Sequence, residues 1–280
     1  MQLGIDIGGT YLRYEIKHHG DSVKKGMLKS AGTGLCSFIE SFLEKEKNIT
    51  TVCISYAGQV RDGVILGAPH IEIDRHHIKA YIENKFNVIL YIENDLNCVV
   101  LAEAASCRSK DVCAIYVGTG LGLGVISDAV LLRGHEHIAA ELGHIPYKET
   151  PFRCACGKSN CIELFASGSG LAAWKKYYGV DPDLSLQALS QVQDEKAKRI
   201  YEAFIEALLH AAGTTITLFN PEILILGGGI MKGNEALEDL ITSKIKAYAM
   251  PLSLQHVKIK ISQKKNAALE GAFLLKDYHG

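Results

Sequence analysis

The sequence lacks the features that mark membrane and secreted proteins. It contains no run of about 18 apolar residues, the length that a helix needs to cross a bilayer. Its first residues, Met-Gln-Leu-Gly-Ile-Asp, have neither the basic nor the apolar region of a signal peptide, and Asp6 places an acid among them. We therefore expect a cytoplasmic protein with no membrane partner.

An excess of charge of either sign is also missing. The 30 Lys and Arg residues nearly balance the 31 Asp and Glu residues, which gives a formal net charge of -1. Proteins that bind nucleic acids usually carry a marked basic excess, so we expect no nucleic-acid partner. With 280 residues, of which 48% are hydrophobic, the chain can bury the core of one large domain or of two ordinary ones.

Three of the eight cysteines form a tight group. The other five stand singly in apolar or helical surroundings, as small buried hydrophobic residues do: Cys36, Cys53, Cys98, Cys107 and Cys113. Cys154, Cys156 and Cys161 lie within eight residues, and His144 precedes them by ten. Three thiolates and an imidazole are a ligand set suited to a tetrahedral zinc ion. Three cysteines cannot all be paired with one another in disulfide bonds.

Four protein ligands would leave no position for a catalytic water, so the spacing predicts a structural Zn²⁺ rather than a hydrolytic one. Three unliganded thiols are the alternative. His144, taken singly, would be a hydrogen-bonded core histidine.

Apolar strands alternate with amphipathic helices along the chain. Strands are expected at residues 3–7, 12–16, 51–55, 88–92, 112–117, 125–126, 223–226 and 257–261, and helices at 34–47, 96–107, 194–218, 234–248 and 267–276. This alternation predicts an α/β fold with mixed sheets.

A strand, a glycine turn and a return strand occur at the N-terminus and again from residue 112, which predicts two related lobes with a cleft between them. The expected N-terminal lobe is 1–108, with the C-terminal helix 266–280 packing back on it. The C-terminal lobe is 109–265 and contains the zinc loop.

Three glycine-rich turns follow apolar strands. The first contains Asp6, Gly8, Gly9 and Thr10, the second runs from Gly118 to Gly124 with Thr119, and the third is Gly227-Gly228-Gly229. Glycines let backbone N–H groups crowd around an anion, and the threonines add hydroxyl donors. Taken singly, each glycine-rich segment could also be an ordinary tight turn with no ligand. Asp6 either binds magnesium through water or anchors its turn. Together, the three turns predict a triphosphate site.

Two common nucleotide motifs are excluded. Gly157-Lys-Ser159 matches the end of a P-loop, but the first glycine of that motif would fall at position 152, where this chain has Phe152. A dinucleotide-binding fingerprint is followed by a helix, whereas the run 118–124 is expected to lead into a strand.

These motifs, in this order, resemble the ROK family of sugar kinases and repressors, within the hexokinase–actin–Hsp70 ATPase superfamily. The resemblance covers essentially the whole chain and rests on these segments: Asp6-Ile-Gly-Gly-Thr10, Glu93-Asn-Asp95, Gly118-Thr-Gly-Leu-Gly122, Glu141-Leu-Gly-His144, Cys154-Ala-Cys-Gly157 through Cys161-Ile-Glu163, and Asn220 through Gly229. It implies a two-lobed actin/hexokinase-like fold with an active-site cleft between the lobes.

The resemblance also implies roles for individual residues. The ATP phosphates would be bound by Asp6, Gly8, Gly9, Thr10, Thr119, Gly120 and Gly122, and the adenosine side by Gly228 and Gly229. Asp95 would be the catalytic base, although an Asp at a strand–helix junction is commonly a helix N-cap. The sugar would be bound by Asn94, Glu141, His144 and Glu163, so His144 would serve both zinc and sugar. Glu93 is expected to be a solvated or structural acid.

The chain departs from the family pattern near the expected sugar site. Ala57 replaces the proline of a Pro-Gly pair, and His70 the asparagine of a Pro-Asn pair. His137 and Ala140 replace two glycines in the segment that ends at Glu141. His70 and His137 either contact an unusual sugar substituent or are surface residues.

The expected activity is transfer of the ATP γ-phosphoryl group, with Mg²⁺, to the 6-hydroxyl of glucose. Fructose, mannose and N-acetylhexosamines are alternative acceptors. Two non-enzymatic alternatives are a sugar-binding protein without catalysis and a sugar-responsive regulator. Regulators of the family carry a helix-turn-helix segment ahead of the first strand, which we do not expect here because that strand begins at Leu3. The family also implies a homodimer.

Overall fold

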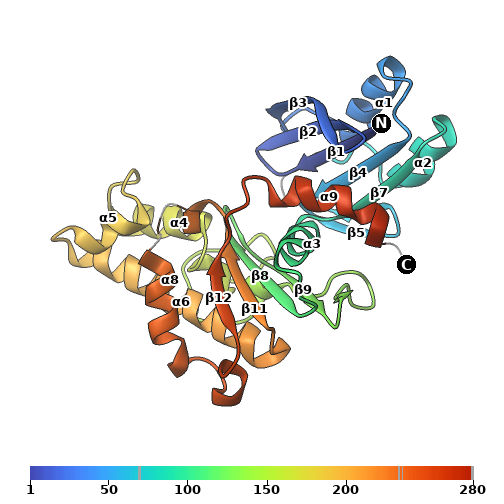
Figure 1. Ribbon diagram of the computed structural model, residues 1–280. Coiled ribbons are helices and arrows are strands. Elements are labelled where there is room, and N and C mark those ends of the chain that lie inside the picture. The colour runs from blue at the N-terminus through green and yellow to red at the C-terminus, as the bar shows by residue number, and fades with distance from the viewer. Residues whose placement is uncertain (69–70, 233, 235, 279–280) are drawn as a thin grey trace. The chain divides into compact units, whose positions relative to one another are not determined.

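The computed structural model describes residues 1–68, 71–232, 234 and 236–278 (Figure 1). The chain folds into two compact units. Unit 1 comprises Met1–Ser106, Arg133–Ala139 and Lys264–Gly280, and unit 2 comprises Cys107–Leu132 and Ala140–Gln263. The segment 133–139 thus belongs to unit 1, although it had been expected in the second lobe. Each unit contains a five-stranded sheet of mixed direction, so the expected mixed α/β fold is confirmed.

The sheet of unit 1 has the strand order β3-β2-β1-β4-β7. Its strands are β1 (Gln2–Ile7), β2 (Tyr11–His18), β3 (Asp21–Lys29), β4 (Thr51–Tyr56) and β7 (Ile89–Asn94). The pairs β1–β2 and β2–β3 are antiparallel, whereas β1–β4 and β4–β7 are parallel. The hairpin β5 (Gln59–Arg61) and β6 (Val64–Gly67) and the helices α1 (Leu35–Lys45), α2 (Ile78–Lys85), α3 (Asp95–Cys107) and α9 (Ala267–Tyr278) complete the unit.

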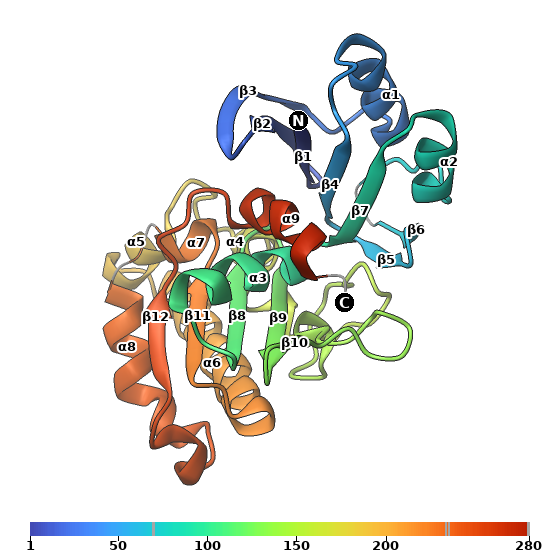
Figure 2. The same ribbon diagram turned by 45° about the vertical axis from the view of Figure 1, so that its right-hand side comes forward.

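Helix α9 packs on β1, β4 and β7, and it also lies close to α3 (Figure 2). A Cβ atom built on Gly271 of α9 would be 1.7 Å from the carbonyl oxygen of Cys98, so only glycine permits this approach. The alternation of apolar residues in β1 places Leu3, Ile5 and Ile7 in the fully buried core. The last helix of the chain is therefore an integral part of unit 1.

The sheet of unit 2 has the strand order β10-β9-β8-β11-β12. Its strands are β8 (Val112–Val117), β9 (Leu121–Ser127), β10 (Val130–Leu131), β11 (Ile223–Gly227) and β12 (Lys258–Ile261). Its helices are α4 (Gly168–Tyr178), α5 (Leu186–Gln191), α6 (Glu195–Phe219), α7 (Gly229–Lys232) and α8 (Ala236–Lys244), with 3₁₀ turns η1 (Leu142–His144), η2 (Ile162–Leu164), η3 (Ile245–Ala247) and η4 (Pro251–Leu254).

Helix α6 is the longest element, with its buried face on the core of unit 2. The Asp194 side chain accepts the N–H of Lys196 at the start of the helix, and Asn220 ends it in the left-handed conformation. None of the helices in the described ranges has both the length and the apolar composition that a membrane crossing requires.

Candidate functional site

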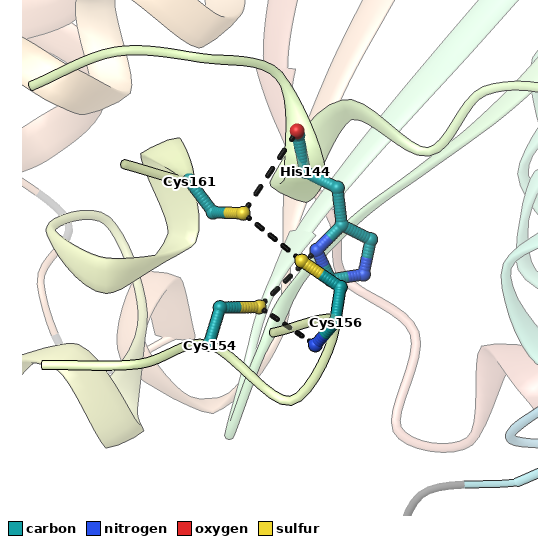
Figure 3. A group of neighbouring side chains, drawn as sticks. All are labelled: His144, Cys154, Cys156 and Cys161. Atoms are coloured by element: carbon teal, nitrogen blue, oxygen red, sulfur yellow. Dashed lines mark hydrogen bonds between the residues drawn. The ribbon is translucent and has the colours of Figure 1, made fainter. Parts of the chain in front are cut away.

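The structure brings together the four residues of the expected metal site (Figure 3). His144 ends η1, Cys154 and Cys156 lie on the following loop, and Cys161 directly precedes η2. One ligand atom from each residue lies within 4.8 Å of all the others. A backbone bridge between Pro146 and Cys161 holds the two ends of the loop together. Residues seventeen positions apart in sequence therefore converge on one point.

The geometry of this cluster fits a tetrahedral zinc ion. Nδ1 of His144 is 3.4 Å from Sγ of Cys154, and the Sγ atoms of Cys156 and Cys161 are 3.3 Å apart. Zn–S bonds of about 2.3 Å imply sulfur–sulfur separations of roughly 3.8 Å in a tetrahedron, so small shifts of the side chains would suffice. The sulfur separation is well beyond the roughly 2.05 Å of a disulfide bond.

The protonation state of the thiols bears on cation binding, because cysteine binds a metal ion as the thiolate. Burial raises the pKa of the Cys154 thiol, which donates its S–H to Oε1 of Glu163 at 2.8 Å. Burial also raises the pKa of Cys161 to about 11, whereas the backbone N–H of Lys158 lowers the pKa of Cys156. Two of the three thiols would thus hold their protons at neutral pH. A divalent cation would stabilise all three thiolates beside the carboxylate.

His144 lies between the group of three thiols and two carboxylates expected to bind sugar. Its Nδ1 lies 3.6 Å from Oε1 of Glu163, and its Nε2 lies 3.8 Å from Oε2 of Glu141. Glu141 directly precedes η1, and Glu163 lies within η2. His144 therefore lies next to the thiols and next to both carboxylates.

The second glycine turn lies next to Glu163. A Cβ atom built on Gly120 would be 3.2 Å from Oε2 of Glu163, so a larger side chain would crowd the carboxylate. The N–H of Gly168, at the start of α4, donates to the carbonyl oxygen of Gly118, and the N–H of Ser169 donates to that of Thr119. The turn is thus tied to the start of a helix.

The third glycine turn packs on the same end of strand β8. Gly228 has a φ of +93°, and a Cβ atom there would be 2.3 Å from the carbonyl oxygen of Val117. Only glycine suits this position. Gly229, at the start of α7, has open space around its Cα. The second and third turns therefore lie side by side at the ends of the neighbouring strands β8 and β11.

In unit 1, the first glycine turn is held by backbone contacts and by Ser30. The N–H of Gly8 donates to the carbonyl oxygen of Tyr11 at 3.0 Å, and the hydroxyl of Ser30 donates to that of Gly8 at 2.5 Å. Gly9 and Thr10 are exposed. Both residues of the turn are therefore accessible to solvent.

Asp6 anchors this turn to its neighbouring strands. Its carboxylate accepts hydrogen bonds from Arg13 on β2 at 3.3 Å and from Ser55 on β4 at 3.2 Å. Burial raises its pKa, and the contacts with Arg13 and Ser55 oppose that rise. The carboxylate is thus tied to β2 and β4, and a water-mediated magnesium contact would have to coexist with the guanidinium of Arg13.

Asn94 and Asp95 stand where β7 ends and α3 begins. Oδ1 of Asn94 accepts the N–H groups of Leu96 and Asn97, and its Nδ2 donates to the carbonyl oxygen of Gly58. Asp95 accepts the N–H of Leu96 at 3.0 Å and is partly exposed. Asn94 therefore takes the larger share of the helix-capping role that the sequence had left open for Asp95.

Two of the departures from the family pattern keep a backbone suited to glycine. His137 has a φ of 59° and Ala140 a φ of 65°, the left-handed region that side chains with a Cβ rarely adopt. The chain thus retains the loop conformation after losing both glycines. Pro69 and His70 lie outside the described residues.

Glu93 and Arg133 form an ion pair that the sequence did not reveal. Glu93, expected to be a solvated or structural acid, is 3% exposed and receives Nε of Arg133 at 2.7 Å. The sequence around Glu93 does not indicate a partner forty residues away, because Glu93 and Arg133 come together only in the folded chain.

Comparison with known proteins shows the family. The ROK family profile matches residues 2–278, and the chain belongs to the ROK family. A glucokinase from Thermotoga maritima is 27% identical over 283 aligned residues, covering 89% of this chain and 88% of the relative. An N-acetyl-D-glucosamine kinase from Pectobacterium carotovorum is 31% identical over 177 aligned residues, covering 58% of each protein. The crystal structure of a ROK family glucokinase from Streptomyces griseus, in complex with glucose and AMPPNP, is similar with a TM-score of 0.78, 25% identity and 97% coverage of both chains.

Proposed function

We propose that this protein is an ATP-dependent sugar kinase whose sugar-binding carboxylates are braced by a structural zinc site. The observation that carries the proposal is the position of His144. Its Nδ1 faces the thiol cluster and Glu163, while its Nε2 faces Glu141. Carboxylates that point in defined directions suit the hydroxyl hydrogens of a polyol. Bound Zn²⁺ would fix these directions through His144, Cys154, Cys156 and Cys161 without taking part in the reaction.

The proposed chemistry requires little covalent work from the protein. Phosphoryl transfer depends mainly on positioning and on stabilising charge. Bound Mg²⁺ would neutralise charge on the ATP phosphates. Backbone N–H groups of the glycine turns would bind the phosphates. The assigned residues are Asp6, Gly8, Gly9, Thr10, Thr119, Gly120 and Gly122, with Gly228 and Gly229 on the adenosine side.

Asp95 is the proposed general base. A partly exposed carboxylate can accept the proton of the attacking sugar hydroxyl as its oxygen bonds to the γ-phosphorus, while the bond from that phosphorus to the bridging oxygen breaks and ADP leaves. Asn94, directly before it, would bind a neighbouring hydroxyl. Glu141, His144 and Glu163 are the other residues proposed to bind sugar. We further propose that the protein is cytoplasmic and works as a homodimer, as its family implies.

Glucose, phosphorylated at its 6-hydroxyl, is the proposed acceptor. The glucokinase relative and the glucose-bound glucokinase structure support it, while the N-acetylglucosamine kinase relative supports a hexosamine. Carboxylates on both sides of His144 suit either sugar. The side chains of His137 and Ala140, where the family has glycines, would adjust the choice.

The acceptor is found by measuring ADP release with ATP and Mg²⁺ across glucose, mannose, fructose, N-acetylglucosamine and N-acetylmannosamine. We expect kcat/KM for glucose to exceed that for the others by at least about tenfold, because a site built to pair particular hydroxyls penalises an analogue that leaves them unpaired. A higher kcat/KM for an N-acetylhexosamine would show that this sugar, and not glucose, is the preferred acceptor.

A sugar-responsive regulator is the rival from another functional class, since the family includes repressors. A protein of that kind would bind sugar saturably in this assay and release no ADP. The balanced charge of the chain, 30 basic against 31 acidic residues, gives no support to DNA binding.

A further inference from the structure

Glu93 is a buried carboxylate at the corner where β7 meets α3. Its side chain is 4% exposed. Oε1 accepts the backbone N–H of Asn94 at 2.9 Å and Nδ2 of Asn97 at 3.1 Å. Oε2 accepts Nε of Arg133 at 2.7 Å. Both oxygens are therefore engaged, and two of the three donors belong to the residues at which α3 begins.

Arg133 supplies the positive charge that accompanies this carboxylate into the interior. Buried carboxylates are stable only when they are paired and hydrogen-bonded. The Nη2 atom of Arg133 is buried and has no hydrogen-bond partner among the described residues, and the side chain borders a cavity of about 350 Å³. The hydrogen bond from Nε to Glu93 therefore holds the guanidinium of Arg133 at the junction of β7 and α3.

The segment 133–139 is held to unit 1 by a second ion pair as well. Glu136 pairs with Arg61 on the hairpin β5–β6, and both side chains are about half exposed. The N–H of Ala139 donates to the carbonyl oxygen of Arg133, which closes the segment into a loop. Both ion pairs fasten the same loop, but only the pair with Arg133 reaches the backbone of Asn94.

We propose that Arg133, acting through Glu93, is a positioning residue for Asn94 and Asp95. The inference rests on the proposed function, in which these two residues meet the sugar. Without the guanidinium, Glu93 would be a buried charge with no cation beside it, and its side chain would reorient. The backbone N–H of Asn94 would then lose a strong acceptor, and Asp95 would lose its fixed place. A misplacement on the order of 1 Å lowers turnover by about 100-fold.

The test compares Arg133→Met, Arg133→Lys and the matched control Arg61→Met, which breaks the exposed ion pair of the same loop. We expect Arg133→Met to lower kcat by about 10- to 100-fold, the usual effect of losing a group that orients a catalytic residue. KM for ATP should change less than about twofold, since the phosphate-binding turns are intact. Arg133→Lys should recover most of kcat, because the ammonium still pairs with Glu93. Arg61→Met should leave kcat within about twofold of the wild type.

Hydrogen exchange gives a readout that does not depend on catalysis. The amide of Asn94 should exchange at least about tenfold faster in Arg133→Met and at the wild-type rate in Arg61→Met. The inference is overturned if Arg133→Met has the wild-type kcat or if Arg61→Met lowers kcat as much as Arg133→Met does. It is also overturned if kcat of Arg133→Lys is no higher than that of Arg133→Met. If the wild type phosphorylates no sugar, the proposed function fails, and unchanged protection of Asn94 in Arg133→Met then overturns this inference separately.

Discussion

Replacing Asp95 by Asn is expected to lower kcat for sugar phosphorylation by about 10²- to 10⁴-fold, the contribution that a positioned general base usually makes. The amide of Asn has nearly the shape of the carboxylate but does not take up the proton of the attacking hydroxyl. Its Oδ1 still accepts the N–H of Leu96, so the start of α3 is preserved. Steady-state kinetics with ATP, Mg²⁺ and the preferred sugar measure the effect.

Asp62→Asn provides the matched control for this prediction. Asp62 lies in the turn between β5 and β6 with a φ of 51°, a conformation that Asn adopts as readily as Asp. The control should keep kcat within about twofold of the wild type, and both variants should keep the wild-type melting temperature. If kcat of Asp95→Asn equals that of the control, Asp95 is not the general base.

Removal of the metal is expected to have the second large effect. We expect about one zinc ion per chain by elemental analysis and none in Cys156→Ala. Loss of an ion present at a thousand times its Kd costs about 4 kcal/mol of unfolding free energy. In a domain of about 150 residues this lowers Tm by roughly 10 °C. The KM for sugar should also rise by about 10- to 100-fold, because Glu141 and Glu163 lose their brace through His144.

Cys107→Ala is the control for the metal prediction, since Cys107 ends α3 and lies outside the cluster. It should retain the zinc, the Tm to within a few degrees and the KM for sugar. A well-folded preparation without metal, or a KM for sugar that stays constant when zinc is lost, would contradict the bracing role.

The features that the sequence predicted best are those encoded by local spacing. The four residues of the expected metal site span eighteen positions, so one short loop brings them together. The glycine turns directly follow strands with a clear apolar run. The strands β1, β8 and β11 were recognisable for the same reason. In each case neighbouring residues contain the whole signal.

The features that the sequence missed depend on contacts made after folding or on weak local signals. Strand β3 is a largely exposed edge strand with little apolar alternation. Helix α4 opens with Gly168 and Gly170, which are poor helix formers, yet Ser167 caps it by accepting the N–H of Gly170. The pairing of Glu93 with Arg133 joins distant segments, and no pattern in either segment indicates the other.

The central claim is that the γ-phosphoryl group of ATP moves to a sugar hydroxyl. The direct measurement supplies ATP labelled in the γ-phosphate, with Mg²⁺ and each hexose in turn, and follows the label by chromatography. The account predicts that the label appears in a sugar phosphate ester in amounts equal to the ADP formed, and that none is transferred when the sugar is omitted. Saturable sugar binding with no labelled ester from any sugar would contradict it.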